Sequence, residues 1–188
     1  MNLACTDWEQ RLREGRSLIP DLPIDQQRGA RAVAIFDKLR LADVPGTPTM
    51  AEASGEWFRG IVRALFGAVD PASKSRWIRE LMLLVPKKNS KTTNGALLML
   101  TALLLNERPR APLIMTAPTH DISDIAYGAV AGAIELDPVL KKILHVRDHL
   151  KTITHRQTKA ELSIMTFDPN TLTGQKAVGV LIDELHVS

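Results

Sequence analysis

The chain has 188 residues, of which 45% are hydrophobic and 24% are charged, and its formal net charge is +3. This composition is typical of a globular protein with a buried core and excludes a disordered or collagen-like chain. The single cysteine, Cys5, excludes an internal disulfide framework and a cysteine-based zinc cluster. The longest strongly apolar stretch, Ala96–Leu105, reaches only about half of the roughly 20 residues that a membrane span needs. Because the N-terminus also lacks the apolar segment of a secretory signal, we expect a soluble intracellular protein that does not enter a membrane.

The first third of the sequence is predicted to be helical. Apolar periodicity predicts helices over residues 4–16 and 25–43, and a stretch rich in proline and glycine over residues 44–55 predicts a surface loop. A further helix is expected over residues 56–66, where Gly67 is placed to end it.

The character of the sequence changes after Trp77. Arg79–Val85 is a short apolar run between polar residues, which is typical of a buried strand. The loop PKKNSKTT leads from it into an apolar helix predicted over Lys91–Asn106. A second buried strand is predicted at Leu113–Ala117, and Asp121 is expected to cap a helix that runs to about Leu136.

The last part of the chain predicts one more helix and three strands. Pro138 is well suited to begin the helix. Alternating apolar and polar residues in Leu150–His155 and Glu161–Phe167 predict an antiparallel hairpin, and Val178–Ile182 predicts a third buried strand. Strands that alternate with helices in this way indicate an α/β layered fold.

The loop before the predicted Lys91 helix is a candidate phosphate-binding loop. The pattern G-x-x-x-x-G-K-[ST] aligns with Val85–Thr92. Lys91 and Thr92 match it, but Val85 and Ser90 stand where the two glycines are expected. A strand–loop–helix order would nevertheless direct backbone N–H groups and the positive end of the helix dipole at one spot. Lys91 would then reach the β- and γ-phosphates and the Thr92 hydroxyl would bind Mg²⁺, while the alternative is a basic turn without a ligand.

The second candidate feature is the acidic end of the last predicted strand. VGVLI at Val178–Ile182 is followed directly by Asp183 and Glu184. A buried strand would position Asp183 to hold Mg²⁺ through water and Glu184 to polarise an attacking water. Taken alone, a solvated strand end is the more common meaning of such a pattern. Ligands of open α/β sheets bind at the carboxyl ends of strands, so the two features together favour a nucleotide site.

Basic residues gather between Lys141 and Lys159. This window contains Lys141, Lys142, Arg147, Lys151, Arg156 and Lys159 against one acid, Asp148. Such a cluster can bind phosphate backbones, but a solvated face is the more common meaning, and the sequence leaves both open.

The order of these motifs resembles the N-terminal ATPase part of large terminase subunits, the motors that package DNA into tailed-phage and prophage capsids. The loop Pro86-Lys87-Lys88-Asn89-Ser90-Lys91-Thr92 is similar to the family's P-[RK]-K-N-x-K-[ST], and Gly55–Gly67 is similar to its W-Q…F-G adenine-side segment. Ala117–Thr119 and the T-G-x-K…V-L-I-D-E-L-H run at Thr173–His186 also match. The resemblance covers residues 55–188 well and the rest more loosely.

The resemblance implies a P-loop NTPase-type fold with a mainly parallel central sheet, a helical N-terminal region over residues 1–54, and a β-hairpin insertion. It implies that ATP and Mg²⁺ are the cofactors of an ATPase domain over residues 55–188. Glu184 and Lys91 would be catalytic, and Thr92 and Asp183 would hold the metal. The expected nucleotide-binding residues are Pro86, Lys87, Lys88, Asn89, Ser90, Lys91, Thr92, Thr93, Trp57 and Phe58.

Two residues depart from the family pattern, and one role is left open. Ser90 stands where many members have glycine, and Phe58 stands where the adenine-reading glutamine is usual. The trans-acting arginine finger of the family is not assigned by the motifs; Arg147 and Arg156 precede the acidic strand, and Lys176 lies close to it.

By the same resemblance, the intact motor would form a homo-oligomeric ring in the host cytoplasm. Its partners would be double-stranded viral DNA, the small terminase subunit and the portal protein. Since the sequence ends shortly after Glu184, we expect a domain truncated after the acidic strand and without the family's nuclease domain. The alternative is a non-catalytic prophage remnant that retains only nucleotide or partner binding.

Overall fold

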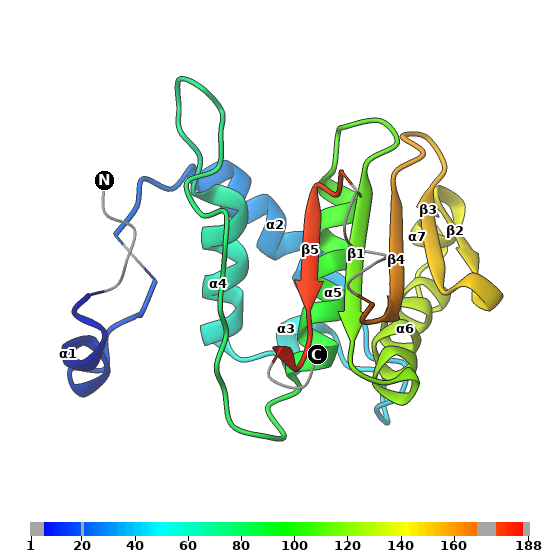
Figure 1. Ribbon diagram of the computed structural model, residues 1–188, viewed down its shortest axis with the longest axis horizontal. Helices are drawn as coiled ribbons and strands as arrows, with labels where there is room; N and C mark the ends of the chain where they lie inside the picture. The colour runs from blue at the N-terminus through cyan, green and yellow to red at the C-terminus, as the bar shows by residue number, and fades with distance from the viewer. Residues whose placement is uncertain (1–5, 20, 169–175, 186–188) are drawn as a thin grey trace. The chain divides into compact units, whose positions relative to one another are not determined.

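The computed structural model describes residues 6–19, 21–168 and 176–185. The chain divides into two compact units, the first formed by Met1–Lys38 and Ala51–Val85 and the second by Leu39–Met50 and Pro86–Ser188. Figure 1 labels the elements of both. Within the described ranges, no helix is long and apolar enough to cross a membrane.

Unit 1 is helical, as predicted for this part of the chain. Its helices are α1 (Trp8–Arg13), α2 (Gln26–Lys38) and α4 (Glu56–Gly67), and the short α3 (Met50–Ala53) lies at the boundary between the units. The core of unit 1 forms where α2 packs on α4, with the ring centroids of Phe36 and Phe58 5.6 Å apart.

Two of the predicted helices are shorter than expected. The first ends at Arg13, and Gly15 follows with a φ of +66°, a conformation that leaves the helix. The second ends at Lys38 because Leu41 N–H donates to the Pro48 carbonyl at 3.0 Å and Arg40 forms a β-bridge with Thr49. These pairings require extended backbone at Arg40 and Leu41, where apolar periodicity alone predicted that the helix would continue to residue 43.

The prediction of a buried strand at Arg79–Val85 is wrong. The segment has no strand hydrogen bonding, and Leu81, Met82 and Leu84 are 48%, 80% and 88% exposed. A strand forms only where a neighbouring strand satisfies its N–H and C=O groups, and no described strand pairs with this segment. Periodicity identified an apolar run but carried no information about a pairing partner.

Unit 2 is built on a five-stranded sheet with the order β2-β3-β4-β1-β5 (Figure 1). Its strands are β1 (Pro112–Ala117), β2 (Leu144–Arg147), β3 (Thr152–His155), β4 (Glu161–Thr166) and β5 (Gly179–Ile182). β1 pairs in parallel with β4 and β5, while β2–β3 and β3–β4 are antiparallel. This confirms an α/β fold with a parallel centre and an attached hairpin.

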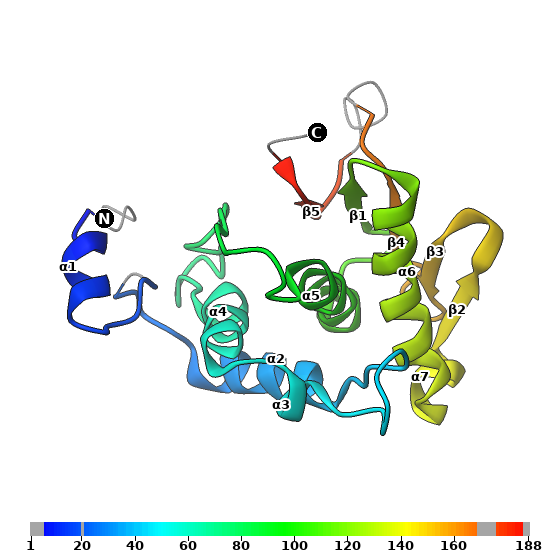
Figure 2. The same cartoon turned by 90° about the horizontal axis from the view of Figure 1, so that it is seen from below.

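Three helices accompany the sheet: α5 (Lys91–Leu105), α6 (His120–Glu135) and α7 (Pro138–Ile143). Viewed along the strands in Figure 2, α5 and α6 lie on the same side of the sheet, and they also contact each other. α7 begins at Pro138 as predicted, capped by Asp137. The predicted cap of α6 is corrected: Thr119 Oγ1 accepts a hydrogen bond from Ile122 N–H, and Asp121 lies in the first turn.

The two edges of the sheet differ from the prediction. The helix α7 passes directly into β2, which the sequence analysis missed, and the 3-10 turn η1 (Asp148–Leu150) joins β2 to β3. At the other edge, β5 pairs with β1 and with no second strand among the described residues, and Val180 and Ile182 are 52% and 37% exposed. β5 is therefore a half-exposed edge strand and not the buried strand that its run of apolar residues predicted.

A close contact between α6 and the 39–50 segment depends on glycine. A Cβ built on Gly132 would lie 2.5 Å from the Ala42 Cβ, which has no rotatable bond with which to move away. One turn earlier on the same helix, a Cβ on Gly128 would meet nothing within 4 Å. Gly132 therefore permits the contact, whereas Gly128 has open space.

We predict opposite effects for alanine at these two glycines. Gly132→Ala should lower the free energy of unfolding by about 1–3 kcal/mol, because the added methyl overpacks the contact with Ala42. Gly128→Ala should raise it by about 0.5–1 kcal/mol, because alanine is the better helix former and nothing obstructs it. Urea denaturation of the two variants beside the wild type measures both, and equal effects would contradict the packing at Ala42.

Candidate nucleotide site

The predicted phosphate loop joins an irregular segment to the start of α5. Asn89 Nδ2 donates to the Pro86 carbonyl at 3.0 Å, which closes the loop on itself. Lys88 and Ser90 have φ angles of +69° and +51°, in the left-handed region. Ser90 thus occupies the conformation that favours glycine, at a cost of roughly 1–2 kcal/mol for an L-residue.

The first turn of α5 has the features of an anion site. Ser90 precedes the helix without a side-chain cap, and its carbonyl accepts from Asn94 N–H at 2.9 Å. The backbone N–H groups of the first turn have no partner within the helix and carry the positive end of its dipole. This turn contains Lys91 and Thr92 and no acidic residue of its own.

The acidic pair follows β5 directly at its carboxyl end. Asp183 N–H donates to the Thr116 carbonyl at 2.9 Å, so the ladder with β1 continues up to this residue. Asp183 is buried, with 6% of its surface exposed, and its Oδ1 accepts from Glu184 N–H at 3.0 Å. Glu184 has a φ of +53°, a strained conformation of the kind that is concentrated at functional sites.

The structure brings the two predicted motifs together. Thr92 Oγ1 donates a hydrogen bond to Asp183 Oδ2 at 2.5 Å. Lys91 Nζ forms an ion pair with Glu184 Oε1, and both side chains are partly buried. Four residues predicted to act on one nucleotide thus form two direct contacts across more than 90 positions of sequence.

The residues at this junction fit a magnesium ion. The Asp183 carboxylate and the Thr92 hydroxyl are hard oxygen donors within hydrogen-bond distance of each other, and Mg²⁺ is usually bound through one or two such groups together with substrate phosphates. The buried position of Asp183 fixes one oxygen at the end of a strand.

Gly95 is a site-shaping residue that the sequence analysis missed. A Cβ on Gly95 would lie 3.0 Å from Leu181 Cδ1, so α5 approaches β5 closely just after the loop. This close approach holds the first turn of α5 against the strand that ends in Asp183. Its signal in the sequence was a glycine inside an otherwise apolar helix, which often has a packing reason.

The remaining predicted residues are divided between the two units. Pro86, Lys87, Lys88, Asn89 and Thr93 belong to unit 2 with the loop and the first turn of α5.

Trp57 and Phe58 belong to unit 1, at the start of α4. Phe58 is 2% exposed and packs on Phe36, whereas Trp57 is 44% exposed. The adenine-side role of this pair stays a prediction, and Trp57 is the ring with accessible surface.

The arginine-finger candidates have unequal surroundings. Arg147 forms an ion pair with Glu161 and donates to Thr154 Oγ1 at 3.1 Å, so its charge is already balanced. Arg156 lies exposed in the turn before β4, and Lys176 lies before β5. The finger role of any of the three stays a prediction.

Thr173–Gln175 and His186, which contributed to the resemblance, lie outside the described residues.

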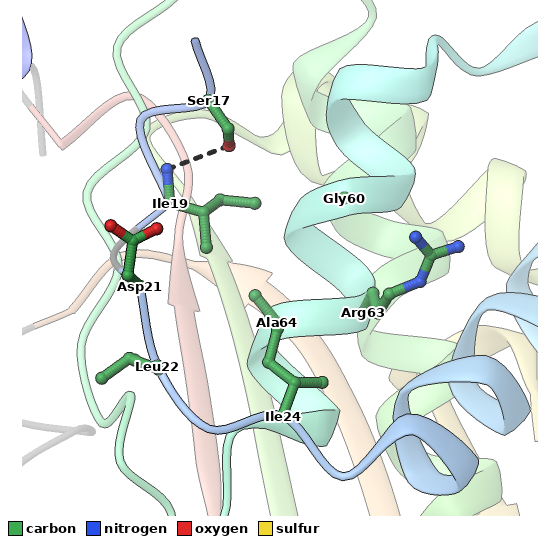
Figure 3. Close-up of a pocket in the computed structure, with 8 residues that line it drawn as sticks. All are labelled: Ser17, Ile19, Asp21, Leu22, Ile24, Gly60, Arg63 and Ala64. Carbon is green, nitrogen blue, oxygen red and sulfur yellow. Dashed lines mark hydrogen bonds between the residues drawn. The ribbon is translucent and has the colours of Figure 1, made fainter. Parts of the chain in front are cut away.

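A separate cavity of about 330 Å³ lies within unit 1. Figure 3 shows the side chains of Ile19 and Ile24 directed toward the Gly60–Ala64 part of α4. The acid at its rim, Asp21, forms an ion pair with Arg11 at 3.0 Å. None of the predicted nucleotide residues lines this cavity.

Comparison with known proteins identifies the family. The family model described as "Terminase large subunit, ATPase domain" matches residues 56–188. The chain belongs to the terminase large subunit ATPase-domain family. The matched range contains both halves of the site, Lys91–Thr92 and Asp183–Glu184. Among curated proteins, no relative matches the chain.

The terminase fold is also supported by a solved structure. The chain is similar to the large terminase of bacteriophage HK97, with a TM-score of 0.67 and 19% sequence identity over 82% of this chain. The chain spans 30% of the length of that terminase.

We predict that the Thr92 hydroxyl stabilises the terminase domain in the absence of nucleotide. Thr92→Val keeps the shape of the side chain but removes the donor to the buried Asp183 carboxylate. A hydrogen bond to a charged group contributes about 1.5–3 kcal/mol, so the free energy of unfolding should fall by that amount. Thr92→Ser, which keeps the hydroxyl, is the matched control. Equal losses for the two variants in urea denaturation would contradict a role for this hydrogen bond.

Proposed function

We propose that the chain is the ATP-binding and ATP-hydrolysing motor part of a terminase large subunit, which powers packaging of double-stranded viral DNA into a capsid. The observation that carries the proposal is the direct contact of Lys91 with Glu184 and of Thr92 with Asp183. This arrangement would bring the groups for phosphate binding, metal binding and water activation to one place, which supports the proposal.

The residues of the loop have binding roles in this mechanism. The N–H groups at the start of α5 and the Lys91 ammonium would bind the β- and γ-phosphates. Lys87 and Lys88 add positive charge to the same loop, and Asn89 shapes it through its bond to Pro86. Thr92 and Asp183 would hold Mg²⁺, which when bound offsets the negative charge that develops on the phosphates.

Glu184 would orient the attacking water and accept its proton. The water oxygen forms a bond to the γ-phosphorus, and the bond from this phosphorus to the β–γ bridging oxygen breaks, which yields ADP and inorganic phosphate. Glu184 forms an ion pair with Lys91 in the absence of nucleotide. Transfer of Lys91 from Glu184 to the phosphates would free the carboxylate for water only when ATP is bound.

Further partners follow from the family and belong to the same proposal. Coupling of hydrolysis to movement of DNA would require a homo-oligomeric ring of large subunits, and packaging would involve the small terminase subunit and the portal protein. The residue range 55–188 would form the ATPase domain, with Trp57 on its adenine side.

Two substitutions should separate binding from hydrolysis. Lys91→Ala should abolish detectable ATP binding, because the charge that faces the phosphates is lost. Glu184→Gln should preserve or strengthen ATP binding, since it removes the competitor for Lys91, and should lower the hydrolysis rate about 10²–10⁴-fold. Fluorescence of a nucleotide analogue measures binding, and release of inorganic phosphate measures turnover.

The control is Lys38→Ala, which removes an exposed lysine of α2 from unit 1. Magnesium removal with EDTA should stop turnover of the wild type. If the wild type binds ATP but shows no turnover that Glu184→Gln can lower, the non-catalytic remnant is the correct description. If Lys91→Ala binds ATP as the wild type does, the proposed site is wrong.

A further inference from the structure

Folding assembles a basic patch in unit 2 that no single stretch of sequence contains. We define the patch as the six exposed cations of three short segments, referred to below as the three connections: Arg108, Arg110, Lys141, Lys142, Arg156 and Lys159. Arg108 and Arg110 precede β1, Lys141 and Lys142 lie at the end of α7, and Arg156 and Lys159 lie in the turn between β3 and β4.

Hydrogen bonds hold the three connections together. Arg110 N–H donates to the Thr158 carbonyl at 2.8 Å, which joins the segment before β1 to the β3–β4 turn. Arg156 N–H donates to the Ile143 carbonyl at 2.8 Å, and Arg156 Nε donates to the Leu144 carbonyl at 3.0 Å. The same turn is thereby tied to the end of α7. Figure 1 shows the β3–β4 turn and the segment before β1 at the same end of the sheet.

The charge of the patch is largely uncompensated. None of its six cations has a carboxylate within ion-pair distance among the residues that the structure describes, and Glu107 is the only acid in the three connections. Two other cations of the Lys141–Lys159 window behave differently, since Arg147 pairs with Glu161 and Lys151 pairs with Asp124. The basic patch therefore excludes Arg147 and Lys151, which form ion pairs, and includes Arg108 and Arg110, which lie outside the Lys141–Lys159 window.

The patch lies at the end of the sheet away from the nucleotide site. β1, β4 and β5 are parallel, and Asp183 and Glu184 follow the carboxyl end of β5. The patch borders the amino ends of β1 and β4, about 20 Å from their carboxyl ends at roughly 3.3 Å per residue. A ligand on the patch would not compete with ATP for the phosphate loop.

We propose that the basic patch binds the phosphate backbone of double-stranded DNA, an inference that rests on the proposed function for its choice of polymer. Lysine and arginine on short exposed connections provide the sequence-independent contacts typical of phosphate recognition. The three connections carry no Phe, Tyr or Trp, so they lack the stacking platforms that single-stranded nucleic acids use. The surface therefore fits a duplex, whose phosphates face outward and whose bases are already stacked.

The test measures DNA binding by the full chain with charge-neutralised variants. Fluorescence anisotropy of short labelled duplexes of two unrelated sequences is followed from about 50 to 200 mM salt. Arg156→Gln/Lys159→Gln should lower affinity about tenfold at the low-salt end and reduce the slope of log K against log salt by about 2. The two duplexes should respond equally, because phosphate contacts carry no sequence information.

The matched control is Arg31→Gln/Lys38→Gln, which removes the same charge from exposed positions of α2. This control should leave DNA affinity within about twofold of the wild type. Thermal denaturation verifies that each variant is folded. A second pair, Arg108→Gln/Arg110→Gln, should reproduce the loss if the connections act as one surface.

The outcomes distinguish this proposal from the proposed function. Lys91→Ala should lose ATP binding and keep DNA binding, whereas the patch variants should lose DNA affinity and keep ATP binding. The proposal that the patch binds DNA would be overturned if the wild type bound no duplex, or if the patch and control variants lost DNA affinity equally. Patch variants that alter oligomeric state in size-exclusion chromatography and leave DNA affinity unchanged would identify a contact between copies of the chain and overturn it as well. Failure of the ATP measurements alone would overturn the motor proposal.

Discussion

The arrangement of unit 2 around its candidate site depends on one junction, where the first turn of α5 meets the end of β5. The Thr92–Asp183 hydrogen bond and the Lys91–Glu184 ion pair join these two elements directly. The junction requires α5 to approach β5 closely, which Gly95 allows because it has no side chain against Leu181. It also requires β5 to run parallel to β1, so that Asp183 emerges at the end of the sheet where the phosphate loop lies.

The same parallel arrangement separates two kinds of electrostatic surface in unit 2. At the carboxyl ends of the strands, opposite charges are paired and partly buried, which suits a site that must hold a charged nucleotide and exclude excess water. At the amino ends, the exposed cations of the basic patch have no carboxylate within ion-pair distance among the described residues. In the proposed motor, separate surfaces would let ATP and DNA bind at the same time without competing.

Much of the fold could be predicted from local patterns. The helix after Lys91, the start of α7 at Pro138 and the β3–β4 hairpin were predicted because their periodicity, capping and turn signals lie within a few residues of the element itself. The failures have a common cause. Arg79–Val85 and Val178–Ile182 have the same apolar character, yet the first forms no strand and the second forms a half-exposed edge strand. A strand needs a pairing partner to form and a packed layer on each face to be buried, and local patterns specify neither. Arg40–Leu41 left the predicted helix for a similar reason.

The sequence by itself determined the identities and order of the groups that make the site: a lysine and a threonine after a basic loop, and two carboxylates after an apolar run. Their chemistry belongs to the residue types and needs no fold to be recognised. Only the tertiary structure decided which of them touch, that Ser90 takes the left-handed conformation, and that Arg147 and Lys151 form ion pairs. It also decided that Arg110 bonds to the turn that carries Arg156. Contacts between residues far apart in sequence depend on strand order and helix packing, which local patterns do not encode.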